Sequence, residues 1–131
     1  RAAAELAAEM ALRVRERGYP VDERAAFAGA MLHDIAKTAP HRHALAGAKW
    51  LLERGYARMA AIVGDHMHLP EAAEADWSEK NIVFLADKLV KDTRRVTLEE
   101  RYFADNDPAK APYREAHYRQ ARRLLDKYHN L

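Results

Sequence analysis

The sequence predicts a single all-α domain of about seven helices. Apolar residues recur at helical spacing along most of the 131 residues, and no segment shows convincing strand alternation. Residues that start and end helices separate these segments, and no low-complexity tract or linker divides the chain. Because this length suits one domain with a sizeable core, we predict one domain over residues 1–131.

The first half of the chain divides into four predicted helices. The first is expected to end at Gly18, because glycine readily takes the left-handed conformation that follows a helix. Asp22 can cap the second helix through its side-chain oxygen. We expect these helices over about residues 3–17, 22–37, 41–54 and 57–68.

Three further helices are predicted in the second half. Ser78 can cap a fifth helix that runs to about Lys91. Thr97 and Glu100 match a capping box and open a short sixth helix, and Pro112 suits the first turn of the last. We expect the core to include one face of the last helix and both tryptophans, namely Tyr113, His117, Ala121, Leu124, Tyr128, Trp50 and Trp77.

Composition restricts the chemistry that the chain can support. Without cysteine the chain has neither disulfides nor thiolate ligands, so any metal must take nitrogen and oxygen ligands. The net charge of +2 is too weak to argue for nucleic acid, which we therefore disfavour as a partner. No apolar run approaches the length of a membrane span and no signal peptide is visible, so we predict a cytoplasmic protein without a membrane partner.

His33 and Asp34 form the most informative pair in the sequence. They place an imidazole and a carboxylate side by side in a segment whose other residues favour burial. Burying both groups is costly unless both are satisfied, and a bound cation satisfies both at once. The alternative is a surface aspartate beside a core histidine.

Three more candidate metal ligands lie in other predicted helices. His43 stands in a first turn, where it could instead be exposed, and His66 lies on an apolar face, where it could instead be a hydrogen-bonded core residue. Asp87 shares a stripe with Val83 and Val90, and buried aspartate is rare unless it is paired or binds a metal. Its alternative is a salt bridge to a buried arginine or lysine.

Charged residues near these ligands could serve a reaction. Lys37 lies one turn beyond the His-Asp pair, and basic residues follow Asp87; such residues usually form a solvated face but can also bind phosphate oxygens. Asp65 and His68 flank His66 and could orient ligands or be ordinary polar residues near a helix end. Our candidates are Lys37 and Asp65 for catalysis, and Lys37, His68, Arg94 and Arg95 for substrate binding.

Five segments together resemble the HD superfamily of metal-dependent phosphohydrolases. They are Leu32-His33-Asp34-Ile35-Ala36-Lys37, His43-Ala44-Leu45-Ala46-Gly47-Ala48, Gly64-Asp65-His66, Glu79-Lys80 and Phe84-Leu85-Ala86-Asp87. The resemblance covers the chain from the first helix to about Arg95. It is greatest to the bacterial branch that includes symmetrical diadenosine tetraphosphate hydrolases.

The resemblance implies a metal centre and a reaction. By position, His33, Asp34 and Asp87 would hold a first ion, and His43 and His66 a second. The ions would be Fe, Mn, Ni, Co or Zn, since mixed nitrogen and oxygen ligands suit these better than Mg alone. A metal-activated water would then hydrolyse a phosphate ester or anhydride of a small substrate such as a nucleotide.

The start of the chain motivates a second hypothesis. The sequence begins with Arg1 inside a helical pattern, and the early histidine of the family has no counterpart before His33. We therefore interpret the sequence as a fragment that lacks the start of its first helix, with a possible upstream domain. The alternative function is a catalytically incomplete HD regulatory or docking domain of a larger protein.

Overall fold

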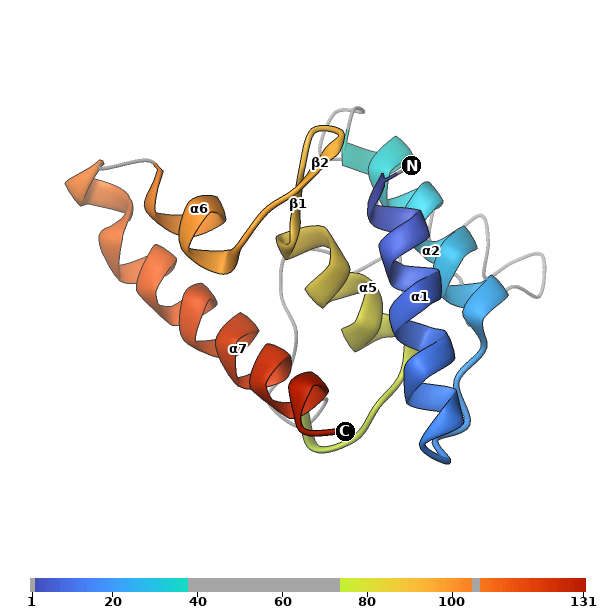
Figure 1. Cartoon of the computed structure of the whole chain (residues 1–131). Coiled ribbons are helices and arrows are strands. Elements are labelled where there is room, and N and C mark those ends of the chain that lie inside the picture. The colour runs from blue at the N-terminus through green and yellow to red at the C-terminus, as the bar shows by residue number, and fades with distance from the viewer. Residues whose placement is uncertain (1, 38–73, 105–106) are drawn as a thin grey trace, which may run out of the picture.

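The computed structural model describes residues 2–37, 74–104 and 107–131, except for the side chains of 34–37 (Figure 1). The predicted helices over 41–54 and 57–68, and Trp50 with them, lie outside the described residues. Within the described ranges no helix combines the length and the apolar character needed to cross a membrane.

Helices dominate the described part of the chain, which confirms the predicted all-α class. A two-stranded hairpin and short 3₁₀-helical turns, including residues 74–75, complete it. In chain order the elements are α1 (Ala2–Glu16), α2 (Glu23–Lys37), α5 (Glu79–Lys88), β1 (Val90–Lys91), β2 (Arg94–Arg95), α6 (Leu98–Phe103), η2 (Pro108–Lys110) and α7 (Ala111–His129).

The end of α1 has the predicted glycine cap. Gly18 has a φ of 97°, in the left-handed region that glycine adopts without strain. Its N–H donates to the carbonyl of Arg15 at 3.0 Å, and the N–H of Tyr19 donates to that of Val14 at 3.4 Å. These two bonds form a Schellman motif, and the Tyr19 ring packs against the core beside it.

Side-chain caps begin α2, α5 and α6 where the sequence predicts them. Asp22 Oδ1 accepts from two backbone N–H groups in the first turn of α2, at 2.8 and 3.4 Å. Ser78 and Asn81 form a capping box at α5, and Thr97 and Glu100 form another at α6. These bonds satisfy N–H groups that have no partner inside the helix, and so they fix where each helix starts.

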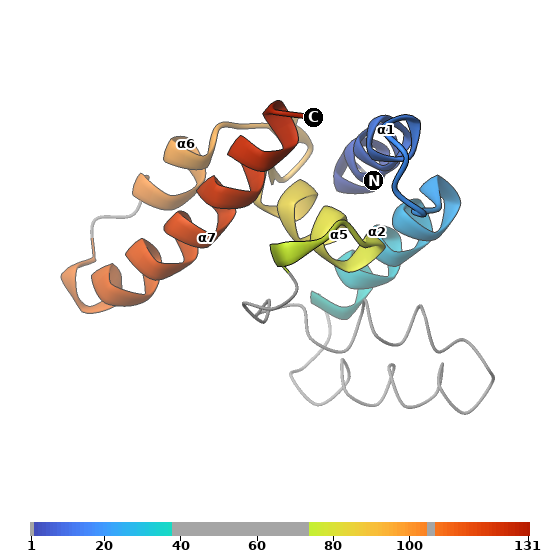
Figure 2. The ribbon, with the colours of Figure 1, turned by 90° about the horizontal axis from the view of Figure 1, so that it is seen from below.

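Helix α5 lies between the α1–α2 pair on one side and α6–α7 on the other (Figures 1 and 2). The buried face of α1 is largely alanine, including Ala4, Ala7 and Ala11, so neighbouring helices can approach its backbone closely. Larger side chains come from α5, where Ile82 and Leu85 are fully buried. The core therefore surrounds α5.

A hairpin follows α5 where the sequence predicted continued helix. Helix α5 ends at Lys88 rather than near Lys91, and Val90 and Lys91 pair antiparallel with β2. Asp92 has a φ of 60° in the turn, a conformation that aspartate tolerates better than most residues. Strands of two residues are too short to show alternation, so the pattern could not reveal them.

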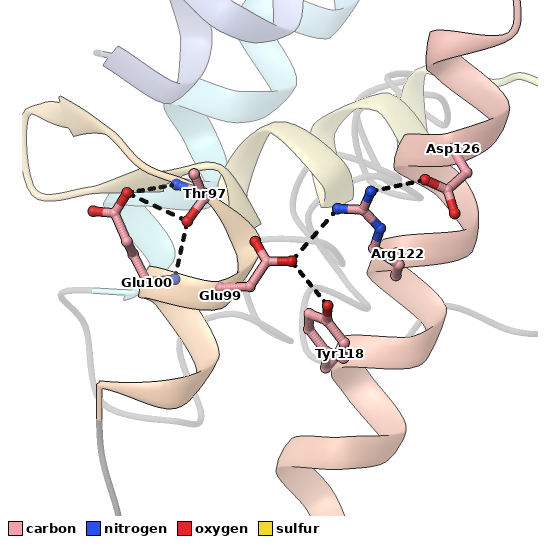
Figure 3. A network of polar contacts seen from close by, with 6 residues as sticks. All are labelled: Thr97, Glu99, Glu100, Tyr118, Arg122 and Asp126. Atoms are coloured by element: carbon pink, nitrogen blue, oxygen red, sulfur yellow. Dashed lines mark hydrogen bonds and ion pairs between the residues drawn. The ribbon is translucent and has the colours of Figure 1, made fainter.

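Polar contacts join α6 to α7 (Figure 3). The Tyr118 hydroxyl donates to Glu99 Oε1 at 2.9 Å, and Arg122 Nη1 lies 3.6 Å from the same oxygen. Arg122 Nη2 also lies 3.1 Å from Asp126 Oδ1, one turn along α7. The carboxylate of Glu99 thus links the two helices at the surface.

The fully buried residues of α7 all lie in its C-terminal half. Ala121, Leu124 and Leu125 are buried, as predicted for the first two. Tyr113 is 73% exposed, so the prediction of a core position for it is wrong. The start of α7 lies beside α6, away from α1 and α2 (Figure 1).

Trp77 anchors the C-terminal end of α7. It is buried, as predicted, and meets the Tyr128 ring edge-on with centroids 6.2 Å apart. Lys127 Nζ lies 4.8 Å from the centre of the Trp77 ring and donates to the carbonyl of Glu74 at 2.8 Å. Arg123 adds two hydrogen bonds to the Glu74 carboxylate, at 2.9 and 3.2 Å.

Candidate metal centre

Two of the five predicted metal ligands meet between α2 and α5. His33 and Asp87 are buried, with 3% and 5% of their surface exposed. Nδ1 of His33 lies 3.9 Å from Oδ1 of Asp87. The fold therefore brings together an imidazole and a carboxylate that lie on separate helices.

The spacing of these two side chains fits a shared metal ion. Zinc, as an example, binds nitrogen and oxygen ligands at about 2.0–2.2 Å, so two ligands of one ion lie at most roughly 4.4 Å apart. The 3.9 Å between His33 Nδ1 and Asp87 Oδ1 is within that limit. A buried imidazole with a buried carboxylate is also a donor set that divalent transition metals accept.

The side chains of six other predicted site residues lie outside the described part of the chain. The backbone of Asp34 and Lys37 belongs to α2, but their side chains are not described. The same holds for the whole of His43, Asp65, His66 and His68. Among described residues, no group of three or more His, Asp or Glu side chains is placed to hold a metal. The roles of these residues stay predictions.

Two cations also approach the Asp87 carboxylate. Lys88 Nζ lies 3.3 Å from Oδ2, and Arg101 Nη2 lies 3.8 Å from the same oxygen. The side chains of Lys88 and Arg101 are 12% and 27% exposed, so solvent screens these pairs only in part. The salt bridge that the sequence offered as the alternative explanation for Asp87 is therefore present.

Arg101 is a site residue that the sequence analysis missed. Its Nη1 donates to the backbone carbonyl of Asp87 at 3.2 Å and to that of Val90 at 2.7 Å. A signal was available in the sequence, because Arg101 lies three residues after Leu98 and one before Tyr102. Leu98 and Tyr102 are both buried, so Arg101 shares the inward face of α6.

Tyr102 lies close enough to Arg101 and Asp87 for their charges to affect the pKa of its hydroxyl. Burial raises the pKa of its hydroxyl to about 12, with Arg101 lowering this pKa and the Asp87 carboxylate raising it. The hydroxyl is buried and has no hydrogen-bond partner among the residues that the structure describes. It therefore stays protonated at neutral pH, as a donor beside the site.

Arg94 and Arg95 lie on β2 and are exposed. Arg94 Nη1 lies 3.5 Å from Glu100 Oε2, and Arg95 Nη2 donates to Glu9 Oε1 at 2.7 Å. The bond to Glu9 raises the pKa of the Arg95 guanidinium. Both guanidinium groups follow Asp87 closely in the chain, and a role in substrate binding stays a prediction.

Buried polar residues at the start of α5 fix this helix against α2. Glu79 Oε1 accepts from the backbone N–H of Asp22 at 3.1 Å, which ties the N-termini of the two helices together. The Asn81 amide donates to the carbonyl of Asp76 and completes the Ser78 capping box. The Glu79 bond helps to set the relative position of α2 and α5, and hence of the ligands that they carry.

Comparison with known proteins identifies the family. The sequence profile of the HD domain matches residues 1–92. The chain belongs to the HD domain family. An uncharacterized protein of Methanocaldococcus jannaschii is 31% identical over 116 residues, which covers 76% of this chain and 68% of the relative. No solved structure matches the chain.

Membership in the HD family suggests which kind of reaction this domain supports. The family suggests the superfamily of metal-dependent phosphohydrolases, and its members typically bind divalent metals. His33 and Asp87 both fall within the matched residues. Helices α6 and α7, with Arg101 and Tyr102, lie beyond them.

Proposed function

We propose that this HD domain is a metal-dependent phosphohydrolase acting on a phosphate ester or anhydride of a nucleotide or related compound. The observation that carries the proposal is the buried contact of His33 Nδ1 and Asp87 Oδ1 at 3.9 Å. Two groups that can both bind a divalent transition metal are thus held together inside a helical core.

In this proposal His33, Asp34 and Asp87 hold a first ion, and His43 and His66 hold a second. Fe, Mn, Ni, Co and Zn suit this donor set better than Mg. When bound, such a metal lowers the pKa of its water and offsets charge on phosphate oxygens. The chain itself supplies a buried, preorganised pair of ligands on two helices whose N-termini are tied by Glu79.

The finer assignments belong to the same proposal. Lys37 and Asp65 are the candidate catalytic residues, and Lys37, His68, Arg94 and Arg95 the candidate contacts to substrate. The exposure of the last two supports this role, because a phosphate can replace a surface carboxylate as their partner. We further propose a cytoplasmic protein close to the symmetrical diadenosine tetraphosphate hydrolases.

A second candidate function is a catalytically incomplete HD regulatory or docking domain. The position of Lys88 and Arg101 favours it, since both approach Asp87 Oδ2. Ion pairs of this kind can satisfy a buried carboxylate without a metal. The two candidates differ in what the removal of Asp87 does to metal binding.

The test combines metal binding with turnover. The purified protein is loaded with Mn²⁺ or Fe²⁺ and assayed on a phosphomonoester, a phosphodiester and diadenosine tetraphosphate. We expect hydrolysis of at least one, and we expect Asp87→Ala to weaken Mn²⁺ binding and lower kcat by about 10³-fold or more. Arg119→Gln, an exposed change in α7, is the control and should alter neither.

A different outcome would select the second candidate. If the loaded protein hydrolyses none of these substrates and Asp87→Ala leaves its Mn²⁺ binding unchanged, the phosphohydrolase proposal fails. Asp87 would then be a structural ion-pair residue of a docking domain.

A further inference from the structure

We infer that Arg101, which lies beyond the HD match, is a positioning residue that holds Asp87 in place as a metal ligand. This inference rests on the proposed function. It means that α6 helps to shape the candidate metal centre formed by α2 and α5. Metal binding by the residues of the HD match would then depend on the segment that follows the match.

One guanidinium group makes all the contacts that support this role. Nη1 donates to the carbonyls of Asp87 and Val90, at 3.2 and 2.7 Å. Nη2 faces the side chain of Asp87, 3.8 Å from Oδ2. Arg101 thus contacts the backbone of the ligand, its carboxylate, and the strand that follows.

The backbone contacts matter because Asp87 lies in the last turn of α5. Carbonyls near a helix C-terminus lack the regular donors of the helix interior and share the cap N–H of Leu89, and a cation there is stabilising. Arg101 adds a charged donor to the Asp87 carbonyl and fixes the path by which the chain leaves α5 toward β1. Lysine would reproduce this only in part, because its single nitrogen cannot bind the two carbonyls from Nη1's position and also place a second nitrogen beside the carboxylate.

Arg101 is itself held firmly. The Thr97–Glu100 capping box orders the start of α6, with bonds of 3.1 and 3.4 Å between backbone N–H groups and side-chain oxygens. Leu98, which is fully buried, and Tyr102 attach the helix to the core on either side of Arg101. The guanidinium is therefore placed by a short, well-anchored helix rather than by a loop.

Arg101 can affect metal affinity in two opposite ways: its charge repels the metal, and its contacts hold Asp87 in place. A cation near the site repels a metal, but Arg101 approaches Oδ2, whereas His33 faces Oδ1. Its hydrogen bonds go to backbone carbonyls, and partial exposure screens its charge. Loss of Arg101 should therefore disorder Asp87 more than it relieves repulsion, and outer contacts to metal ligands typically contribute 10–100-fold in metal affinity.

The experiment measures Mn²⁺ affinity and thermal stability side by side. Arg101→Met and Arg101→Lys are compared with Arg123→Gln, which removes two hydrogen bonds to Glu74 without touching the centre. The Kd for Mn²⁺ is measured by electron paramagnetic resonance well below the melting temperature. We expect Arg101→Met to weaken binding about 10-fold or more, Arg101→Lys less, and Arg123→Gln to lower the Tm alone.

Each outcome has a defined meaning. A wild-type protein that binds Mn²⁺, with Arg101 variants that bind it equally or more tightly, overturns this inference and leaves the proposed function intact. If Arg101→Met does not fold, Arg101→Lys decides by the same criterion. If the wild-type protein binds no Mn²⁺, the proposed function fails and the inference with it.

Discussion

Different interactions stabilise two regions of the molecule: the helical core of α1, α2 and α5, and the C-terminal arm of α6 and α7. In the core, alanines and aliphatic side chains pack without solvent around α5. In the arm, 19 residues of α7 bury only Ala121, Leu124 and Leu125. Charged and aromatic contacts attach the rest.

This difference shows which polar residues need a functional explanation. In the arm, Arg122 pairs with Glu99 and Arg123 pairs with Glu74, and these ion pairs account for their charges. His33 and Asp87 lie inside the core, where packing alone would favour apolar side chains. Their deep burial, and not a lack of ion-pair partners, directs attention to the contact of α2 with α5.

The largest expected effect tests whether apolar packing dominates the core. Leu85→Ala in α5 removes a fully buried side chain and should cost about 2–5 kcal/mol of unfolding free energy through lost burial and a cavity. Leu125→Ala in α7 is the matched change, and it should cost less because Leu125 lies near the edge of the core. Urea unfolding gives both values, and equal costs would contradict the comparison.

A smaller effect tests the polar attachment of the arm. The hydrogen bond from Arg123 lowers the pKa of the Glu74 carboxyl below its ordinary value of 4.5. A lowered pKa in the folded state means that Glu74 stabilises the protein above its unfolded pKa and loses that effect as pH falls through the folded one. Glu74→Gln should therefore cost about 1.5 kcal/mol at pH 7.

The pH dependence is the decisive part of the Glu74 measurement. The stability difference between Glu74→Gln and the wild type should shrink as the pH falls below about 4. Glu115→Gln removes an exposed carboxylate paired with Arg119 on the same helix, and it should change nothing measurable. A Glu74 effect that is constant from pH 7 to pH 3 would show that its charge plays no part.

The smallest expected effect is a stabilisation, and it concerns Tyr102, which lies where the core meets the arm. Tyr102→Phe removes a buried hydroxyl that has no partner within the described part of the chain, so it should stabilise the protein by about 0.5–1 kcal/mol. Thermal unfolding measures the change, with the exposed Tyr113→Phe as control. Destabilisation by Tyr102→Phe would show that the hydroxyl is satisfied after all.

Local signals made much of the fold predictable. Gly18, Asp22, Ser78 and Thr97 each act on neighbours within a few residues, so the sequence alone indicates where helices begin or end. The burial of Asp87 followed equally from its stripe of apolar neighbours. Its contact with His33 could be expected only through the family resemblance, because the two residues lie on separate helices.

The exposure of Tyr113 and the contacts of Arg101 depend on tertiary structure, so local sequence patterns did not predict them. The spacing of Tyr113 identifies an apolar face of α7 but not whether anything covers it. The bonds of Arg101 reach across the hairpin to Asp87 and Val90, and no local pattern specifies that reach. Its position on the inward face of α6 was the one available hint.

The most direct test of the central claim is anomalous scattering at the manganese edge from crystals grown with Mn²⁺. We expect a peak between α2 and α5, within about 2.2 Å of a His33 ring nitrogen and an Asp87 carboxylate oxygen. Density without a peak there, and with Asp87 bound only to Lys88, Arg101 and His33, would contradict it.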